Sequence, residues 1–549
     1  MTCLSSLLRS RLLRYCLPLC IVATPACKGG SDTSRGGAGG PAPQPVAVDV
    51  ATYHNDIART GQNLSETILT PANVNAASFG KIGFYPVDGK VDAEPLLISS
   101  LAIAGGTHNV LFVVTEHASI YAFDADDGTQ LWKVSALPAG ESPSDDHGCG
   151  QITPEIGITA TPVIDRTRGP HGALYTVAMS KDGAGVYHQR VYALDLTTGA
   201  GLFGGSTEVA ATYPGSGANS SNGHVVFDPK QYAERASLLL LNGVVYTAWT
   251  SHCDQGVYGG WMMGYSADTL RQTTVLSLTP NGSGGSVWMS GAGLASDGAS
   301  IFLLDANGTF DATLDANGFP ANGDFGNAFI RLGTANGLSV ADYFAISSTI
   351  DESARDEDFG SGGALVLPDL KDANGAVHHL ALGAGKDESI YVVNRDAMGK
   401  YSPTANNIEQ QVTGQLQGGV FSMPAYFGNT VYINAFGDRL KAFTITNARL
   451  STTPSSQSAT TFPFPGATPG ISANGSAGGI VWAIENGTLA VLHAFDAGNL
   501  ANELYNSNQK GTRDQFGAGN KFVTPMIANG KVYVGTTNGV AVFGLLPKS

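Results

Sequence analysis

The stretch Ile120-Tyr-Ala-Phe-Asp-Ala-Asp-Asp-Gly-Thr-Gln-Leu-Trp132 decides the fold of this chain. It begins with apolar and aromatic residues that are typical of a β-strand. Asp124 and Gly128 then supply a tight turn, because Asp accepts backbone hydrogen bonds and Gly tolerates positive φ. A second apolar run, 109–114, comes just before. The segment therefore predicts a small antiparallel sheet in which the pattern Ala-x-Asp-x-x-x-Gly-x-x-x-Trp leads into an outer strand.

The same arrangement recurs along the chain, with looser copies toward the C-terminus. A single sheet of this kind cannot bury both faces, whereas sheets stacked around an axis cover one another and leave only short edges. Eight such units predict an all-β fold, an eight-bladed β-propeller. Beyond the first unit, the paired runs are 173–178 with 191–199, 244–249 with 263–268, 301–304 with 328–332, 379–382 with 390–394, 431–434 with 440–443, 480–484 with 492–496, and 532–535 with 540–543.

The ring of blades also has to close. The last unit ends at Phe543, near the C-terminus, while 81–87 is a strand-like run ahead of the first full unit. We expect this N-terminal strand to complete the final blade, because the pairing removes two exposed sheet edges. The composition agrees with many short strands and tight turns, since the chain has 71 Gly and 26 Pro and is 43% hydrophobic.

The first 27 residues differ from the rest of the chain and predict an export signal over 1–27. Arg9, Arg11 and Arg14 form a positive region ahead of the apolar run 17–23. That run is too short to span a bilayer, as is usual for a signal peptide.

The end of this signal resembles a bacterial lipobox. The sequence Thr-Pro-Ala-Cys ends at Cys27, which a lipobox would lipidate; cleavage without lipidation is the alternative. A Gly/Ser/Pro-rich tether over 28–48 would hold the globular part away from a surface, and 49–549 would form a single propeller. We expect an exported protein of the periplasm or outer membrane, held to the membrane only by its lipid.

Cysteine usage and charge narrow the possibilities further. After the signal, only Cys149 and Cys253 remain, and in an oxidising compartment they predict one disulfide. Their polar neighbours leave a metal site as the alternative, although no Cys-x-x-Cys spacing supports zinc. The formal net charge is −15, with no Lys/Arg-rich run beyond the first residues. This excludes a nucleic-acid partner, which needs a basic surface.

The repeats resemble the pyrroloquinoline-quinone (PQQ) repeat. That repeat occurs in quinoprotein alcohol dehydrogenases and in non-catalytic lipoproteins that help assemble outer-membrane proteins. The resemblance covers nearly the whole mature chain, and 52–59 with 69–74 is similar to the opening segment of the dehydrogenases. The repeat itself implies only the architecture, so activity depends on the cofactor-site positions.

Five positions resemble the cofactor site of the dehydrogenases and occur in the same order. Trp288 resembles the Trp that forms the floor under the quinone, and Lys386 resembles the basic residue that contacts it. Asp254 and Asn307 fall near the family's calcium-ligating Glu and Asn. Asp358 resembles the catalytic Asp and is the third expected calcium ligand.

The chemistry that this resemblance implies is oxidation of an alcohol or sugar with PQQ and Ca²⁺, passing electrons to an external acceptor. Carboxylate and amide oxygens suit Ca²⁺, and a cation beside the quinone carbonyl would polarise it. Asp358 would be the general base on the substrate hydroxyl. Lys386 would stabilise charge on the reduced quinone.

Each position also has a structural interpretation. Trp288 can pack between blades, as Trp132 is expected to do, and Asn307-Gly is a common turn dipeptide. Asp358 can belong to a solvated acidic loop, and Lys386 to a surface turn. The alternative function is a non-catalytic propeller that binds a protein or glycan at the cell envelope.

The chain also departs from the dehydrogenases. It lacks the pair of adjacent cysteines that closes a small ring over the quinone, and no Cys-x-x-Cys-His run could attach a haem. Asp254 is shorter than the family's Glu, and Glu357 stands where the family has Trp. These differences concern the cofactor site and leave the fold prediction unchanged.

Overall fold

The computed structural model describes residues 47–547. The predicted signal, Cys27 and nearly all of the predicted tether lie outside the described residues. Strands make up almost all of the regular structure, and none of the helices in this part of the chain is long and apolar enough to cross a membrane. Its helical segments are α1 (Thr349–Ala354), η1 (Met289–Gly291), η2 (Phe359–Ser361) and η3 (Gly511–Asp514).

Most strands fall into repeated antiparallel sheets. Within 47–547, eight sheets contain four or more strands. The first is β3 (Leu96–Ile103), β4 (Gly106–Val114), β5 (Ser119–Asp124) and β6 (Gln130–Ser135). The second is β9 (Val163–Asp165), β10 (Ala173–Lys181), β11 (Tyr187–Asp195) and β12 (Gly201–Glu208), joined by β7 (Ser142–Asp145) and β8 (Glu155–Ile156). The third is β16 (Tyr232–Glu234), β17 (Leu239–Leu241), β18 (Val244–Ser251), β19 (Trp261–Ser266) and β20 (Gln272–Ser277).

The remaining large sheets repeat this order. The fourth is β21 (Ala295–Ser296), β22 (Ser300–Leu304), β23 (Ala328–Gly333) and β24 (Ser339–Ala345), and the fifth is β25 (Leu365–Val366), β28 (Leu380–Ala384), β29 (Ile390–Asn394) and β30 (Gln410–Val412). The sixth is β31 (Ala425–Phe427), β32 (Thr430–Ile433), β33 (Asp438–Thr446), β34 (Arg449–Leu450) and β35 (Ser456–Phe462). The seventh is β1 (Gln62–Asn63), β36 (Gly470–Asn474), β37 (Ala477–Glu485), β38 (Val491–Asp496) and β39 (Asn499–Asn506).

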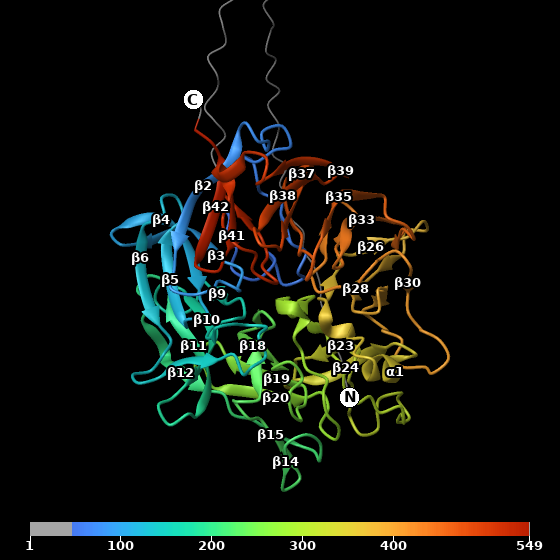
Figure 1. Ribbon diagram of the computed structural model, residues 1–549. Helices are drawn as coiled ribbons and strands as arrows, with labels where there is room; N and C mark the ends of the chain where they lie inside the picture. Colours follow the sequence, from blue (N-terminus) through green and yellow to red (C-terminus); the bar gives the residue numbers. More distant parts are fainter. Residues whose placement is uncertain (1–46, 548–549) are drawn as a thin grey trace, which may run out of the picture. The chain divides into compact units, whose positions relative to one another are not determined.

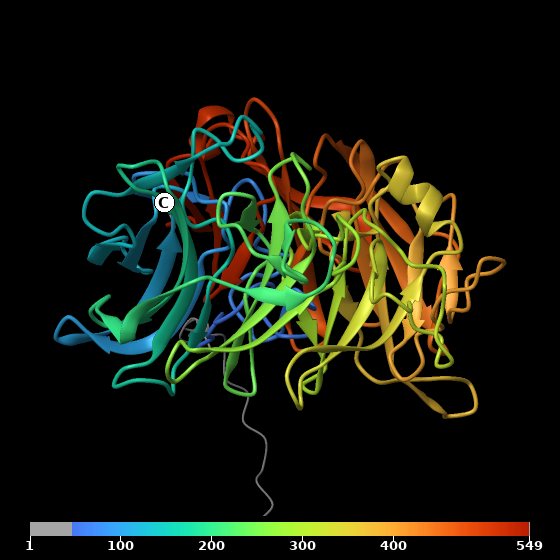
Figure 2. The same ribbon diagram turned by 90° about the horizontal axis from the view of Figure 1, so that it is seen from below.

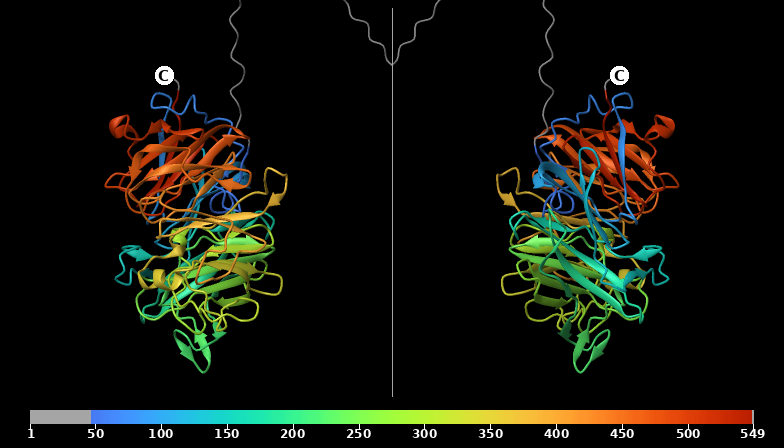
Figure 3. Two further views of the ribbon diagram at one scale, coloured as in Figure 1. Left: turned by 90° about the vertical axis from the view of Figure 1, so that its right-hand side faces the viewer. Right: turned by 90° about the vertical axis from the view of Figure 1, so that its left-hand side faces the viewer.

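The eighth large sheet contains strands from both ends of the described chain, β40 (Met526–Ala528), β41 (Lys531–Gly535), β42 (Gly539–Leu545) and β2 (Phe79–Pro86). β2 pairs antiparallel with β42, from Phe79 opposite Leu545 to Pro86 opposite Gly539. This is the N-terminal run that the sequence assigns to the final sheet. Figure 3 shows the blue β2 lying against the red C-terminal strands.

The large sheets follow one another around a common axis in sequence order (Figure 1). Figure 2 shows the same sheets standing side by side, with loops at both ends of their strands. Two small sheets are additions to this arrangement. They are β13 (Thr212–Pro214) with β14 (Ser220–Ser221) and β15 (His224–Val226), and β26 (Leu370–Lys371) with β27 (Val377–His378).

The repeat motif at 120–132 forms the predicted turn between two strands. Asp124 Oδ1 accepts the N–H of Asp126 at 2.8 Å, and Gly128 has φ +80°, so the chain turns from β5 into β6. Trp132 donates its Nε1–H to the carbonyl of Leu196 in the next sheet at 3.0 Å. All six residues of β5 are buried, because neighbouring sheets cover both of its faces.

The segment ahead of β2 is fastened to the sheets by a buried arginine. Arg59 is fully buried and donates to the carbonyls of Tyr53, Leu238 and Leu294 at 2.7, 3.1 and 2.8 Å. Leu238 and Leu294 immediately precede β17 and β21, so one guanidinium joins the N-terminal segment to two neighbouring sheets. Its N–H groups replace water with backbone acceptors, which offsets the cost of burying its charge.

Candidate functional site

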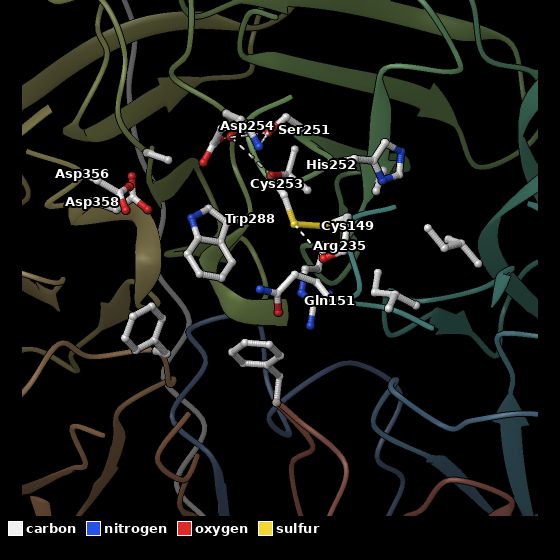
Figure 4. A pocket seen from close by; sticks show the side chains of 18 of the residues that line it. Cys149, Gln151, Arg235, Ser251, His252, Cys253, Asp254, Trp288, Asp356 and Asp358 are labelled. Carbon is white, nitrogen blue, oxygen red and sulfur yellow. Dashed lines mark hydrogen bonds between the residues drawn. A yellow bond between two sulfur atoms is a disulfide. The ribbon is translucent and has the colours of Figure 1, made fainter. Parts of the chain in front are cut away.

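A cavity of about 470 Å³ brings together four of the five predicted cofactor-site residues. Asp254, Trp288, Asp358 and Lys386 all line it, and Figure 4 shows Asp356 and Asp358 on one side of the Trp288 ring with the disulfide on the other. Asp254 follows β18 and Lys386 follows β28, and each of these strands pairs with the first strand of its sheet. Trp288 and Asp358 lie in the segments that lead into the next sheets. Because the sheets repeat one strand order around the axis, equivalent loops meet at one end.

The central polar feature of the cavity is the ion pair between Asp358 and Lys386. Lys386 Nζ lies 2.8 Å from Asp358 Oδ2 and 2.8 Å from Asp356 Oδ1. Asp358 is only 5% exposed, whereas Asp356 is exposed. Burial raises the pKa of Asp358, and the Lys386 ammonium opposes that rise. Burial alone would lower the pKa of Lys386, but Asp358 and Asp356 raise it above its usual range. The solvated-loop interpretation therefore fits Asp356 but not Asp358.

Asn307 donates hydrogen bonds to both carboxylates that contact Lys386. It does not line the cavity; it lines an adjoining recess together with Asp254. Its backbone N–H donates to Asp358 Oδ1 at 2.9 Å, and its Nδ2 donates to Asp356 Oδ1 at 2.7 Å. Its Oδ1 is buried and has no hydrogen-bond partner among the described residues. An acceptor left in this state is costly unless a donor or cation meets it.

Asp254 lies in an exposed turn at the rim of the cavity. Its Oδ1 accepts the hydroxyl of Ser251 at 3.0 Å and the hydroxyl of Tyr258. Burial, with the Asp254 charge beside it, raises the pKa of Tyr258, so that hydroxyl stays a donor. Asp254 is thus held in place, although one of its oxygens already has protein donors.

Trp288 forms a wall of the cavity and is only half-buried. The next two residues, Met289 and Ser290, have φ of +40° and +54°, a left-handed backbone that L-residues adopt at a cost. Ser290 Oγ donates to the carbonyl of Ser361 at 2.6 Å, which ties the Trp288 turn to the segment carrying Asp358. Trp132, in contrast, donates to the adjacent sheet, so the two tryptophans have different surroundings.

Several lining residues carry no sequence motif. Cys149 and Cys253 form a disulfide, and both line the cavity. Phe421 and Phe522 approach Trp288 with ring centroids 6.0 and 6.2 Å away. Sequence reasoning paired the cysteines without placing them at the site, and it missed the other lining residues because they come from separate loops. Asp356 could have been suspected from its spacing of two from Asp358.

The described residues contain some, but not all, features of a metal site. Within residues 47–547 no three His, Cys, Asp or Glu side chains are grouped closely enough to hold a metal ion. The expected calcium set contains two carboxylates, Asp254 and Asp358, and one amide, Asn307. All offer oxygens, which Ca²⁺ prefers, and the unpartnered Oδ1 of Asn307 is free to ligate. The donor set therefore fits a hard cation in type.

Comparison with solved structures shows what the fold is similar to. A quinohemoprotein alcohol dehydrogenase from Comamonas testosteroni aligns with a TM-score of 0.57 and 13% identity over 91% of this chain and 82% of that one. The chain shares its overall fold with this structure. A quinohemoprotein alcohol dehydrogenase from Pseudomonas putida HK5 gives 0.57 and 13% over 91% and 81%, and a europium-containing methanol dehydrogenase gives 0.53 and 11% over 90% and 98%. No protein-family model and no curated protein matches the chain. At these identities the likeness shows the fold alone.

Proposed function

We propose that this protein is a quinoprotein-type dehydrogenase that oxidises an alcohol or sugar, built on an eight-bladed propeller closed by β2. The observation that carries the proposal is the buried Asp358–Lys386 pair in a cavity walled by Trp288. Oxidation of a hydroxyl by a flat quinone needs a base, a cation and a broad apolar face. The fold shared with alcohol and methanol dehydrogenases supports the same function.

The residues fit PQQ and Ca²⁺ in chemical type. Trp288 and Lys386 would hold the quinone, and Asp254, Asn307 and Asp358 would hold the cation. When bound, these groups supply the electron acceptor and a Lewis acid. Asp358 Oδ2 would accept the proton of the substrate hydroxyl, and its raised pKa makes it a stronger base than an ordinary carboxylate. Lys386 favours the charged form of that carboxylate and so opposes the effect of burial.

A second candidate is a non-catalytic propeller that binds a protein or glycan at the cell envelope. It is favoured by the contacts that the proposed calcium-binding side chains already make with other side chains of the protein. Asp254 accepts from Ser251 and Tyr258, and Asp358 pairs with Lys386. In this interpretation the same contacts only fix the loops at one end of the sheets.

The cellular location is part of the proposal. We infer that the signal in 1–27 directs export and that the protein is lipid-anchored at Cys27. The protein would then lie in the periplasm or at the outer membrane. An external acceptor would then take the electrons. Mass spectrometry of the mature N-terminus tests this, since Cys27→Ser should remove the lipid mass and release the protein from the membrane fraction.

The activity is tested by reconstitution. Purified protein is mixed with PQQ and Ca²⁺, quinone binding is followed by absorbance, and dye-linked oxidation of alcohols and sugars is measured. Asp358→Asn should abolish turnover while the quinone still binds, because it removes the base and keeps the side-chain size. Asp351→Asn is the matched control, because Asp351 is an exposed acid in α1.

The outcomes separate the two candidates. Binding and turnover that depend on Asp358, with Asp351→Asn unchanged, would support the dehydrogenase. An absence of quinone uptake by the folded wild-type protein would overturn it and leave the binding propeller.

A further inference from the structure

Arg235 is a buried cation at the cavity that the five predicted positions do not include. It follows β16 directly, is 7% exposed, and lines the same cavity as Trp288 and Lys386. It also lines a much smaller neighbouring cavity that contains Asp92. Its guanidinium therefore lies at the inner end of the candidate site.

The guanidinium has no counter-ion in contact. Among the described residues no carboxylate lies within 4 Å of it and none of its N–H groups donates a hydrogen bond, and its Nε is fully buried. Arg59 is the internal comparison, because it is also buried but donates its N–H groups to backbone carbonyls. Arg cannot shed its charge as a buried Lys can. A buried charge without a partner is costly, and residues 47–547 supply none to Arg235.

The nearest acids do not replace that partner. Burial lowers the pKa of Arg235 and the charges of Asp92 and Glu116 only partly restore it. Asp92 also lies 3.7 Å from Lys90 Nζ. Burial raises the pKa of Glu116 well above its usual range, which disfavours the charged form of that carboxyl. The charge around Arg235 therefore remains positive.

A second cation adds to this positive charge. Lys521 Nζ donates to Gln151 Oε1 at 3.0 Å, and Gln151 lines the cavity. Burial lowers the pKa of Lys521, and repulsion from Arg235 and Lys90 lowers it further. An anion bound at Arg235 would relieve both costs.

The position of Arg235 relative to Trp288 indicates the shape and charge of the ligand that the cavity would bind. In Figure 4, Asp356 and Asp358 lie on one side of the Trp288 ring, and Arg235 lies on the side of the disulfide. The Arg235 Cζ also lies 4.5 Å from the ring centroid of Phe522, which holds the guanidinium beside the aromatic wall. A flat molecule against Trp288 with a carboxylate at its far edge would reach Arg235, whose planar N–H groups match a carboxylate in a bidentate pair.

We propose that Arg235 is the anion-binding residue of this cavity and holds a carboxylate of the quinone cofactor. The inference rests on the proposed function, and it deepens that function by assigning which end of the cavity takes the acidic edge of the ligand. PQQ carries three carboxylates, so it meets this requirement. The bond formed is a charge-assisted hydrogen bond, and no group is transferred.

The test measures binding without turnover. PQQ and its trimethyl ester are titrated into wild type, Arg235→Gln and the control Arg271→Gln, and Kd is taken from fluorescence quenching. Arg271 is an exposed arginine outside the cavity. Arg235→Gln should weaken PQQ binding at least tenfold. The ester should bind wild type and Arg235→Gln equally, because it lacks the charges that Arg235 would contact.

A stability measurement shows whether Arg235→Gln weakens binding directly or by unfolding the protein. Without ligand, Arg235→Gln should be at least as resistant to urea as wild type, because the change removes an unpaired buried charge. A structural arginine would instead destabilise the protein when replaced.

Three results would overturn the inference. One is equal PQQ affinity of wild type and Arg235→Gln. Another is a tenfold difference that persists with the ester. The third is a large loss of stability in ligand-free Arg235→Gln. If wild type binds no PQQ at all, the proposed function fails together with this assignment.

Discussion

Replacing Lys386 by Met removes the one cation that, among the described residues, contacts the buried Asp358. The ammonium is 2.8 Å from Asp358 Oδ2, and the Lys386 side chain is 20% exposed. Breaking a buried ion pair costs about 3–5 kcal/mol when the other charge stays behind. Because solvent reaches part of this pair, we expect a loss near the lower end, about 3 kcal/mol, together with a further rise in the pKa of Asp358.

The loss should depend on pH in one direction. The pKa of Asp358 in the folded protein is raised by burial, and removing Lys386 raises it further. The stability that a protonated Asp358 contributes is present at low pH and disappears as pH rises through the folded pKa. Lys386→Met should therefore be about 3 kcal/mol less stable than wild type near pH 8, and the difference should shrink as the pH falls.

Urea unfolding at several pH values measures this difference. The double variant Lys386→Met/Asp358→Asn should recover most of the loss near pH 8, because the buried charge is gone. Lys371→Met is the control, since Lys371 is exposed in β26. A loss that is independent of pH, or that Asp358→Asn does not relieve, would refute the reasoning.

Three other predictions concern stability. The double change Cys149→Ser/Cys253→Ser opens a loop with a sequence separation of 104 and should cost about 4–5 kcal/mol in non-reducing urea unfolding; an unchanged midpoint would contradict it. Burial raises the pKa of Glu94 to about 8, so wild type should lose up to about 5 kcal/mol as pH rises from about 4.5 to 8. Glu94→Gln should flatten that dependence, and a parallel curve for the variant would show that Glu94 is not its source. Trp132→Phe should cost about 1 kcal/mol through its lost bond to Leu196, measured by thermal unfolding against Trp132→Ala, which should cost more.

The repeating part of the fold could be predicted because its signals are local. Asp124 and Gly128 set a turn within a few residues, Asp195 and Gly199 repeat that spacing, and later copies keep the paired strand runs. The assignment of the N-terminal run to the final sheet followed from the need to cover sheet edges. The structure places that run, β2, beside β42. Such features depend on strand period and turn chemistry, which a single sequence displays.

The site was predictable only in part. Asp254, Trp288, Asp358 and Lys386 were found through resemblance, and the structure places them around one cavity. Their partners were not found, because contacts such as that of Asn307 N–H with Asp358 depend on how loops from different sheets meet.

The rest of the cavity shows the same limit. Arg235 and Phe522 lie far apart in sequence and belong to no motif, yet the ring and the guanidinium are in contact. No local pattern encodes such a pairing.

The partnership of β2 with β42 has a consequence for how the chain is made. β2 is synthesised long before its partner β42, because, apart from β1, the strands of all the other large sheets lie between them in the sequence. Until β42 is made, the edge of β2 that later pairs with it has no hydrogen-bonding partner. Such an edge is prone to pairing with other chains. The same pairing brings the two ends of the fold into one sheet. A circular permutant that joins them and opens another surface loop should keep every strand pair, and it would let neighbouring strands meet in the order in which they are made.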